Sequence, residues 1–287
     1  MLAPGQGVLV LVGTPLGNRG DLSPRARDAI LSADLILCED TRSPTRLFAT
    51  GMALPPRVSC FAARESQRSE QLHTHLAEGK RVVFVSEAGM PVWSDPGARL
   101  VQAAVAGGFE VDVIPGPTAA ATALCLSGFS GANVRFAGFL ARSGKSRTDA
   151  LTRIASDDSV TIVYEAGNRV PALLRDLAAA MGEQASKREI VIGRELTKMH
   201  QQVLRGSVAE LHASTREPLR GEVTVVIAGG KPVAGEEQDQ ARAVWEAVCE
   251  PALKPRARAR RIAELTGLPS GTVYEQLVAT GLSSRRD

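Results

Sequence analysis

Short apolar runs that alternate with helical patterns constrain the fold of this chain more than any other feature. Four runs near the start have the length and residue types of β-strands, at 8–12, 34–38, 81–86 and 110–114. Each is nearly continuous in apolar residues, as expected for strands that are buried on both faces of a parallel sheet. Helical patterns separate them; one begins at Ser23 and Pro24, which suit an N-cap and a first helical turn. The alternation predicts an α/β fold.

A second α/β unit and a helical tail are expected to follow. The stretch 128–133 is rich in Gly, Ser and Asn and lacks apolar periodicity, which is typical of a linker. Strand patterns then recur at 135–139, 160–164, 188–192 and 222–228. The chain has 287 residues, more than the ~100–200 of one domain. We therefore expect an N-terminal α/β domain at 1–127, a C-terminal α/β domain at 134–230 and a small α-helical tail at 236–287.

Composition excludes several classes of protein. No apolar run approaches the ~18 residues of a membrane span, and the start lacks the pattern of a secretory signal. A cytoplasmic protein is therefore expected. The four cysteines form no CxxC pair, and the neighbouring His73 and His75 face different sides of a helix, so no metal site is expected. The net charge of +3 is compatible with nucleic-acid binding but does not demonstrate it.

Loops rich in glycine, proline and polar residues follow all four strands of the first unit. They read Gly-Thr-Pro-Leu-Gly-Asn at 13–18, Glu-Asp-Thr-Arg at 39–42, Ser-Glu-Ala-Gly-Met-Pro at 86–91 and Pro-Gly-Pro-Thr-Ala at 115–119. The carboxyl ends of parallel strands share one edge, where open α/β sheets bind ligands. One such loop is typical of an ordinary turn. Four at the same edge predict a ligand site.

The common nucleotide-binding signatures are absent. No GxGxxG string follows the first strand, which excludes the dinucleotide fingerprint. The stretch from Gly138 to Ser146 is similar to a P-loop, but five residues separate its glycines where a phosphate-cradling turn has four. The ligand site therefore belongs to another class.

The chain resembles the tetrapyrrole-methylase superfamily of S-adenosylmethionine-dependent enzymes, and within it the branch that methylates small-subunit ribosomal RNA. The loop strings above carry the resemblance, together with Asp-Pro-Gly at 95–97, Gly-Phe-Leu at 138–140, Arg-Glu-Leu-Thr-Lys at 194–198 and Arg-Gly-Glu-Val at 220–223. The match is collinear over roughly residues 8–230. The first loop combined with 39–42 and 194–198 is specific to this branch.

The resemblance implies that two α/β domains hold S-adenosylmethionine in the cleft between them, in a homodimer. It also implies methylation of a cytidine 2′-hydroxyl in the decoding region of 16S rRNA in the small ribosomal subunit. The residues implied to contact the cofactor are Pro15, Glu87, Ala88, Gly89, Thr118, Ala119, Tyr164, Glu165, Ala166, Leu196, Gly221 and Glu222. The basic residues expected to hold RNA phosphates are Arg42, Arg142, Lys145, Arg147, Arg194 and Lys198.

A ribose hydroxyl is a poor nucleophile, so a base must take its proton during attack. Asp40 is the first candidate for a base or orienting carboxylate, and Glu195 is the second. The structural alternative for each is a salt bridge, to Arg42 or to Arg194 respectively.

The chain departs from the family at some positions, and these departures leave alternatives open. Glu87 and Met90 stand where the branch usually has Asp and Thr, and Ala-Gly-Asn at 166–168 replaces Ser-Pro-His. A segment that often carries His-Asn reads Ala-Ala-Arg-Glu-Ser at 62–66. One alternative is a methyltransferase of a tetrapyrrole or corrin precursor, and another is a catalytically weakened rRNA-binding assembly factor.

Basic residues favour an RNA acceptor. They cluster at 142–147 and again at 254–261. The stretch 254–280 has the pattern of a helix-turn-helix, with its second helix capped by Ser270, or of a plain helical hairpin.

Overall fold

The computed structural model describes residues 7–61, 64–130, 133–230, 243–248, 250 and 253–280. They divide into two compact units, Met1–Gly229 and Gly230–Asp287. The first unit contains two five-stranded sheets, and the second contains helices only in its described part. Parts of the expected linker, at 131–132, and of the expected tail, at 236–242, 249, 251–252 and 281–287, lie outside the described residues.

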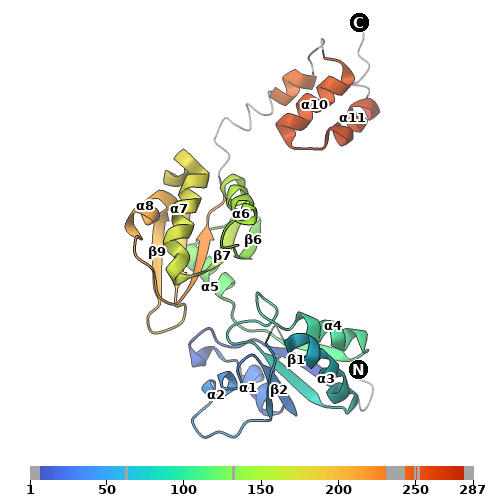
Figure 1. Ribbon diagram of the computed structural model, residues 1–287, viewed down its shortest axis with the longest axis vertical. Helices are drawn as coiled ribbons and strands as arrows, with labels where there is room; N and C mark the ends of the chain where they lie inside the picture. The colour runs from blue at the N-terminus through green and yellow to red at the C-terminus, as the bar shows by residue number, and fades with distance from the viewer. Residues whose placement is uncertain are drawn as a thin grey trace. The chain divides into compact units, whose positions relative to one another are not determined.

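The first sheet is entirely parallel. Its strands are β1 (Val8–Val12), β2 (Leu35–Cys38), β3 (Arg57–Ser59), β4 (Arg81–Val85) and β5 (Glu110–Ile114), in the order β3-β2-β4-β1-β5. The connections include α1 (Pro24–Leu31), α2 (Ser43–Arg46), α3 (Glu65–Ala77) and α4 (Ala98–Ala106), with a 3-10 turn at Arg19–Asp21 (Figure 1). Parallel pairing brings the carboxyl ends of all five strands to one edge.

Helices cover both faces of the first sheet. On one face the strands pack with Ala26, Ala29 and Ile30 of α1. On the other they pack with Leu72 and Leu76 of α3 and with α4. β1, β2 and β4 are buried as expected, but β5 is an edge strand with several exposed side chains. The expectation of burial on both faces is therefore wrong for β5, which lies at the edge of the sheet and is not fully covered by the packed helices.

Local sequence explains where two helices begin. The Ser23 hydroxyl accepts a hydrogen bond from the Ala26 N–H (3.1 Å), and Pro24 occupies the first turn of α1, as predicted. Helix α4 begins at Ala98, directly after Gly97, which is its N-cap with φ 125°. The preceding residues therefore remain free to form a loop at the sheet edge.

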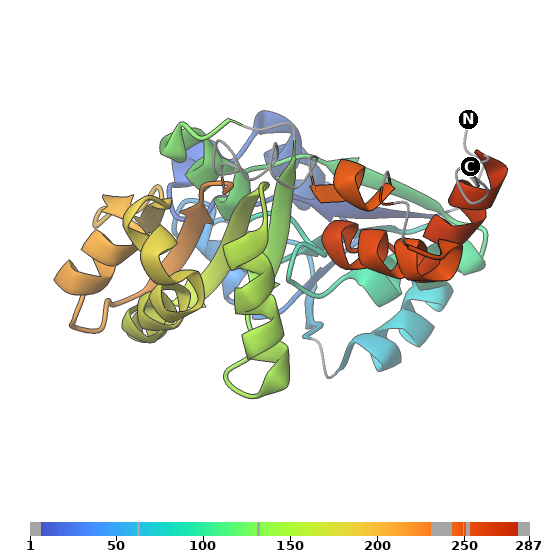
Figure 2. The same ribbon diagram turned by 90° about the horizontal axis from the view of Figure 1, so that it is seen from above.

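The second sheet is mixed. Its strands are β6 (Val134–Phe139), β7 (Val160–Ala166), β8 (Glu189–Arg194), β9 (Gln202–Ser207) and β10 (Glu222–Ile227), in the order β6-β7-β10-β8-β9. Only β6 and β7 are parallel. The helices are α5 (Ala119–Ser127), α6 (Lys145–Ser156), α7 (Val170–Met181) and α8 (Val208–Ser214), with 3-10 turns at Gly167–Arg169 and Gly182–Ser186. Helices α6, α7 and α8 cover one face and α5 the other (Figures 1 and 2).

The second compact unit is helical in its described part. Residues 243–248 form a helical segment, followed by α10 (Pro255–Thr266) and α11 (Ser270–Ala279). A small core that includes Ala247, Ile262 and Leu277 joins the three segments. Helix α10 ends at Gly267 with φ 73°, and the N-cap of α11 is Pro269, one residue before the expected Ser270. No helix in the described ranges is long and apolar enough to cross a membrane.

Candidate active site

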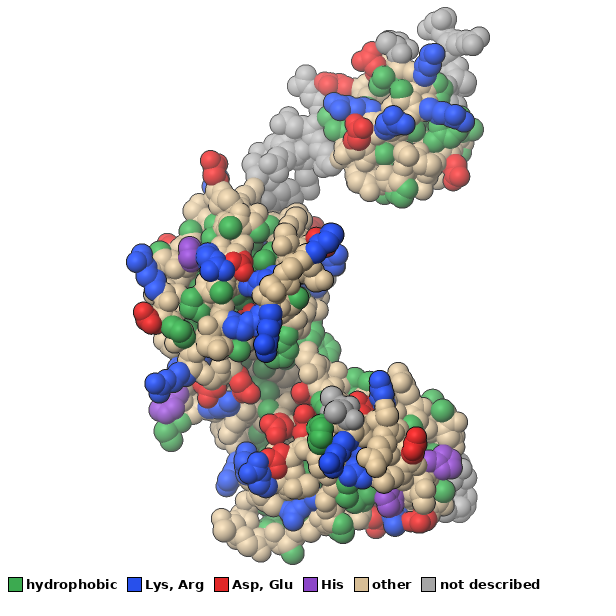
Figure 3. Space-filling view, viewed as in Figure 1, with side chains coloured by type: hydrophobic (Ala, Val, Ile, Leu, Met, Phe, Trp, Pro, Cys, Tyr) green, Lys and Arg blue, Asp and Glu red, His purple; other side chains and the backbone are tan. Residues whose placement is uncertain are grey.

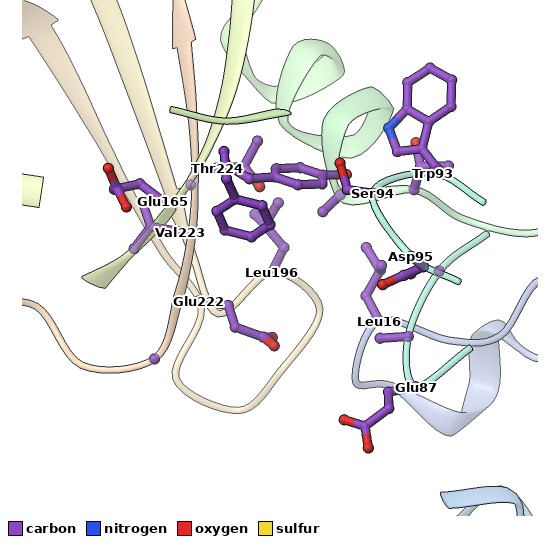
Figure 4. Close-up of a pocket in the computed structure, with 18 of the residues that line it drawn as sticks. Leu16, Glu87, Trp93, Ser94, Asp95, Glu165, Leu196, Glu222, Val223 and Thr224 are labelled. Atoms are coloured by element: carbon purple, nitrogen blue, oxygen red, sulfur yellow. The ribbon is translucent and has the colours of Figure 1, made fainter. Parts of the chain in front are cut away.

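A cavity of about 440 Å³ lies between the carboxyl edge of the first sheet and the strands of the second (Figure 4). The first sheet's loops contribute Leu16, Glu39, 87–90, 93–95, Thr118 and Ala119. The second half contributes Phe139, 164–166, Gly193, Leu196, Lys198 and 221–224. Each of the four loops singled out in the sequence reaches this cavity. Its volume lies within the range of about 300–1,000 Å³ that is usual for small-molecule sites.

The structure brings together all of the expected cofactor-contacting residues except Pro15. Pro15 is buried and does not line the cavity, whereas its neighbour Leu16 does. The Thr14 N–H donates to the Gly89 carbonyl (2.8 Å), and the Gly89 N–H donates to the Thr14 carbonyl (3.0 Å). This pair of hydrogen bonds fixes the start of the loop. We include Leu16 among the candidate cofactor contacts in place of Pro15, because Leu16 lines the cavity.

Two loops of the first sheet meet backbone to backbone. A Cβ placed on Gly13 would lie 2.6 Å from Gly116 backbone atoms, and one on Gly116 would lie 2.8 Å from those of Gly13. The Gly116 N–H also faces the Met90 sulfur at 3.2 Å. Met90, one of the departures from the family pattern, therefore packs where the first, third and fourth loops meet.

The loop at 92–97 is held in an unusual conformation. Val92 and Ser94 have φ values of 72° and 65°, in the left-handed region that costs a non-glycine residue about 1–2 kcal/mol. The Val92 N–H donates to the Pro96 carbonyl (3.1 Å). The buried Glu65 carboxylate accepts from the N–H groups of Gly97 (2.9 Å) and Arg99 (2.8 Å). These bonds hold Asp95 at the cavity wall (Figure 4).

Four aromatic rings form a wall beside the cavity. Trp93 stacks on Phe136 with ring centroids 4.8 Å apart. Phe136 and Phe139 each make an edge contact with Tyr164, at 4.9 and 5.6 Å. The Tyr164 hydroxyl accepts a hydrogen bond from the Ala120 N–H (3.2 Å) at the start of α5. Phe139 remains 61% exposed, which is unusual for a phenylalanine and leaves a ring face open to a ligand.

Carboxylates give the cavity a negative lining. Glu39, Glu87, Asp95 and Glu222 all line it, and acidic side chains gather in this part of the first unit (Figure 3). Burial, together with the negative charges of Glu39 and Glu87, raises the pKa of Asp95 to about 7. Burial also raises the pKa of Glu39, against the hydrogen bond from the Glu87 N–H. A negative lining suits a cationic ligand.

Glu195 has a structural role in this geometry. Its Oε1 accepts from the Glu222 N–H (2.9 Å) and from Lys198 Nζ (3.1 Å). Its backbone has φ 49°, and its N–H donates to the Glu222 carbonyl (3.0 Å). The hydrogen bond from Glu222 holds the pKa of Glu195 below its ordinary value. Glu195 does not line the cavity, and its ion-pair partner is Lys198 rather than the expected Arg194.

Asp40 also forms a salt bridge and does not line the cavity. Its Oδ2 lies 2.6 Å from Arg42 Nη2, and Arg42 Nε lies 3.0 Å from both carboxylate oxygens. The Arg42 side-chain hydrogen bonds lower the pKa of Asp40 to about 2. A carboxylate held so strongly in its ionised form is a weak base. The salt-bridge alternative therefore describes Asp40 better than the role of base.

The basic residues expected to hold RNA are not equally available. Arg142 is exposed, Lys145 pairs with Asp149, and Arg194 Nε donates to the Arg220 carbonyl. Lys198 lines the cavity and pairs with Glu222 (2.6 Å). The Arg147 side chain is only 8% exposed and pairs with Asp176 (2.8 Å). Arg147 is therefore less available to a phosphate than the other basic residues, because its guanidinium is already buried and paired.

The departure at Gly167 has a structural reason. A Cβ at this position would lie 2.5 Å from the Leu219 carbonyl oxygen. The Gly167 N–H donates to the Gly221 carbonyl (3.0 Å), a bond that proline cannot make. Glycine therefore lets the end of β7 and the loop before β10 lie close together at the cavity.

Sequence reasoning missed several lining residues: Leu16, Glu39, Trp93, Ser94, Asp95 and Phe139. Asp95 and Phe139 lie in the Asp-Pro-Gly and Gly-Phe-Leu strings, which carry the family resemblance but imply no role for either residue. The signal in the sequence that could have identified Asp95 as a site residue was its carboxylate directly before a Pro-Gly turn.

The residues present fit S-adenosylmethionine, which is positively charged at sulfur and at its amino group. The carboxylates complement those charges, and the start of α5 and the glycine loops bring backbone N–H groups close. Apolar and aromatic side chains, among them Leu16, Leu196 and Tyr164, offer surfaces for an adenine ring. Among the described residues, no cluster of His, Cys, Asp and Glu could hold a metal ion.

Comparisons with known proteins agree with this geometry. The family model for tetrapyrrole (corrin/porphyrin) methylases matches residues 8–212. The "Ribosomal RNA small subunit methyltransferase I" of Micromonospora olivasterospora is 40% identical over 279 residues, covering 95% of this chain and 87% of that protein. Its Thermotoga maritima counterpart is 41% identical over 225 residues, covering 78% and 99%.

Solved structures share the fold at lower identity. A cobalt precorrin-4 methyltransferase has a TM-score of 0.59 at 15% identity, covering 79% of this chain and 98% of that one. A uroporphyrin-III C-methyltransferase from Thermus thermophilus, solved with S-adenosylhomocysteine, has a TM-score of 0.55 at 17% identity, covering 78% and 97%. They confirm the predicted α/β class. The chain belongs to the tetrapyrrole methylase family, in the branch formed by ribosomal RNA small subunit methyltransferase I.

Proposed function

We propose that this protein transfers a methyl group from S-adenosylmethionine to the 2′-hydroxyl of a cytidine in the decoding region of 16S rRNA. The protein is an S-adenosylmethionine-dependent methyltransferase. The observation that carries the choice of acceptor is the identity of about 40% to small-subunit rRNA methyltransferases along nearly the whole chain. We further propose that it acts as a homodimer in the cytoplasm.

The lining of the cavity supports a division of roles. Bound S-adenosylmethionine supplies a methyl group made electrophilic by its sulfonium. We propose that Leu16, Tyr164 and Leu196 contact the adenosyl part. The carboxylates of Glu39, Glu87 and Glu222 offset the positive charges of the sulfonium and the amino group. Closing this site against water would leave attack by a correctly oriented hydroxyl as the favoured reaction.

Basic and aromatic residues support RNA as the acceptor. Lys198 at the cavity and the exposed Arg142 would hold phosphates, whereas Arg147 is left out of this set. Exposed basic side chains of α10, including Arg256 and Arg260, would add contacts to the RNA backbone that do not depend on sequence. A tetrapyrrole acceptor is less supported, since the relatives at 35–41% identity carry the name of an rRNA enzyme.

Methyl transfer to isolated small subunits tests the function. Subunits from cells that lack this protein are mixed with it and with S-adenosylmethionine carrying a labelled methyl group. We expect one label per subunit, located by nuclease digestion and mass spectrometry on a 2′-O-methylcytidine of the decoding region. Subunits from cells that contain the protein should accept almost none. Label on a tetrapyrrole precursor alone, or cofactor binding without any transfer, would refute the proposal.

Phe139 is expected to stack on a base of the bound RNA. Stacking of a base on an aromatic ring contributes about 1–3 kcal/mol, so Phe139→Ala should raise KM for the small subunit about tenfold. The turnover number and the Kd for S-adenosylmethionine should change little. Phe139→Tyr should restore KM, and the exposed Val105→Ala on α4 is the matched control. An unchanged KM for the small subunit in Phe139→Ala would show that Phe139 does not stack on the RNA.

A further inference from the structure

Asp95 is one of the carboxylates that line the cavity, and no proton transfer has yet been assigned to it. Its side chain lines the wall formed by the first sheet's loops, near Leu16 and opposite Leu196 and Glu222 (Figure 4). It is partly buried, unlike the exposed carboxylate of Glu222, whose side chain is 79% exposed and paired with Lys198. Among the described residues, no ion pair includes Asp95. A carboxylate that is partly shielded from water and not held by an ion pair keeps its ability to take up a proton.

The backbone around Asp95 is built to hold this side chain in place. The left-handed conformations of Val92 and Ser94 flank it on one side. The buried carboxylate of Glu65 clamps the other side through Gly97 and Arg99. Strain of this kind persists only where surrounding contacts enforce it, and it clusters at functional sites.

Several other titratable groups in or near the site are less suited to take a proton. Burial raises the pKa of the Tyr164 phenol, which therefore keeps its proton at neutral pH. Glu195 and Asp40 lie outside the cavity and are held ionised by hydrogen bonds. Glu39 accepts a hydrogen bond from the Glu87 N–H (3.3 Å), which ties its carboxylate to the neighbouring loop.

We propose that Asp95 is the general base that takes the proton of the acceptor ribose hydroxyl, an inference that rests on the proposed function. The 2′-oxygen forms a bond to the methyl carbon while the carbon–sulfur bond breaks and its electron pair stays on sulfur. The hydroxyl proton passes to the Asp95 carboxylate. The carboxylic acid then loses this proton to water, so that no further reactant is needed.

The charged groups that face Asp95 set the pH at which it can act. Burial raises its pKa to about 7, with contributions from Glu39, Glu87 and Glu222, while a hydrogen bond from Ser86 opposes the rise. A base acts in its ionised form. The single-turnover rate should therefore rise about tenfold per pH unit below pH 7 and level off above it.

Single-turnover methylation with Asp95→Asn tests the inference. A positioned base contributes about 10²–10⁴-fold to the rate. We therefore expect the rate to fall at least 100-fold and the change of slope near pH 7 in its pH profile, called the break below, to disappear. The Kd for S-adenosylmethionine, measured by calorimetry, and the Kd for the subunit should stay within about threefold. Asp28→Asn, which changes an exposed carboxylate on α1, is the matched control and should behave as the wild type.

A second variant and a direct titration keep the test decisive. Glu39→Gln removes a negative charge that raises the pKa of Asp95, so the break should move to lower pH. The carboxyl carbon of Asp95 in the cofactor-free wild type, followed by NMR, should titrate near pH 7. A rate in Asp95→Asn within threefold of wild type, or a wild-type profile flat between pH 5 and 8 with a low titration of Asp95, would overturn the proposal. Failure of the wild type to methylate any subunit would instead refute the proposed function.

Discussion

Replacing Gly116 with alanine is expected to weaken S-adenosylmethionine binding at least tenfold and to lower the free energy of unfolding by about 2–3 kcal/mol. The added Cβ would lie 2.8 Å from the carbonyl carbon and Cα of Gly13. These atoms belong to the backbone and have no rotamer through which to move away. The loop of Gly13 must therefore shift, and it carries both the Thr14–Gly89 bridge and the cavity residue Leu16.

Calorimetry with S-adenosylmethionine and urea unfolding followed by circular dichroism measure the two effects of Gly116→Ala. Gly108→Ala is the control, because Gly108 has φ 74° and a Cβ there meets no atom within 4 Å. Its conformational strain should cost about 1–2 kcal/mol without any change in cofactor affinity. If both variants bind the cofactor like the wild type, the contact between the two loops does not shape the site.

Replacing Glu165 with alanine is expected to lower the free energy of unfolding by about 3–5 kcal/mol, because it leaves a largely buried arginine without its partner. Glu165 lies on β7 and is only 2% exposed. Its Oε1 accepts from the Ala166 N–H (3.0 Å) and lies 3.3 Å from Arg169 Nη1. In the described structure, Glu165 Oε2 and Arg169 Nη2 are both buried without a hydrogen-bond partner.

Urea unfolding separates the loss of the Glu165–Arg169 pair from a simple loss of volume. Glu165→Gln retains the size of the side chain and an acceptor for the Ala166 N–H, so it should destabilise less than Glu165→Ala. Replacing both residues with leucine removes the unpaired charge and should recover part of the stability. A double variant less stable than Glu165→Ala would show that the unpaired arginine is not the source of the cost.

Local patterns were enough to predict the fold class and the sheet edge at which the cavity lies. The apolar runs identified β1, β2, β4 and β5, and the four loops after them do reach one cavity. Strands β3 and β9 were missed because they are short or polar and are not fully buried. Pairing with a neighbouring strand, rather than composition, makes these residues strands.

The roles of charged residues were less predictable from the sequence. Arg147 lies in a basic stretch that is typical of an RNA contact, yet Asp176 of α7 neutralises it. Asp40 and Glu195 were the expected bases, but hydrogen bonds hold both of them ionised. Such pairings depend on which helices and loops pack together, and residue types along the chain do not reveal them.

The sequence by itself determined most of the strands and helices along the chain, the four loops at one sheet edge and the family to which the chain belongs. These follow from periodicity and turn chemistry, which act over a few residues. Only the tertiary structure placed Asp95 among Glu39, Glu87 and Glu222, and joined Trp93 to Phe136 and Tyr164. The physical reason is that burial and electrostatic fields come from segments far apart in the chain, so a residue's pKa and its exposure exist only once those segments have packed together.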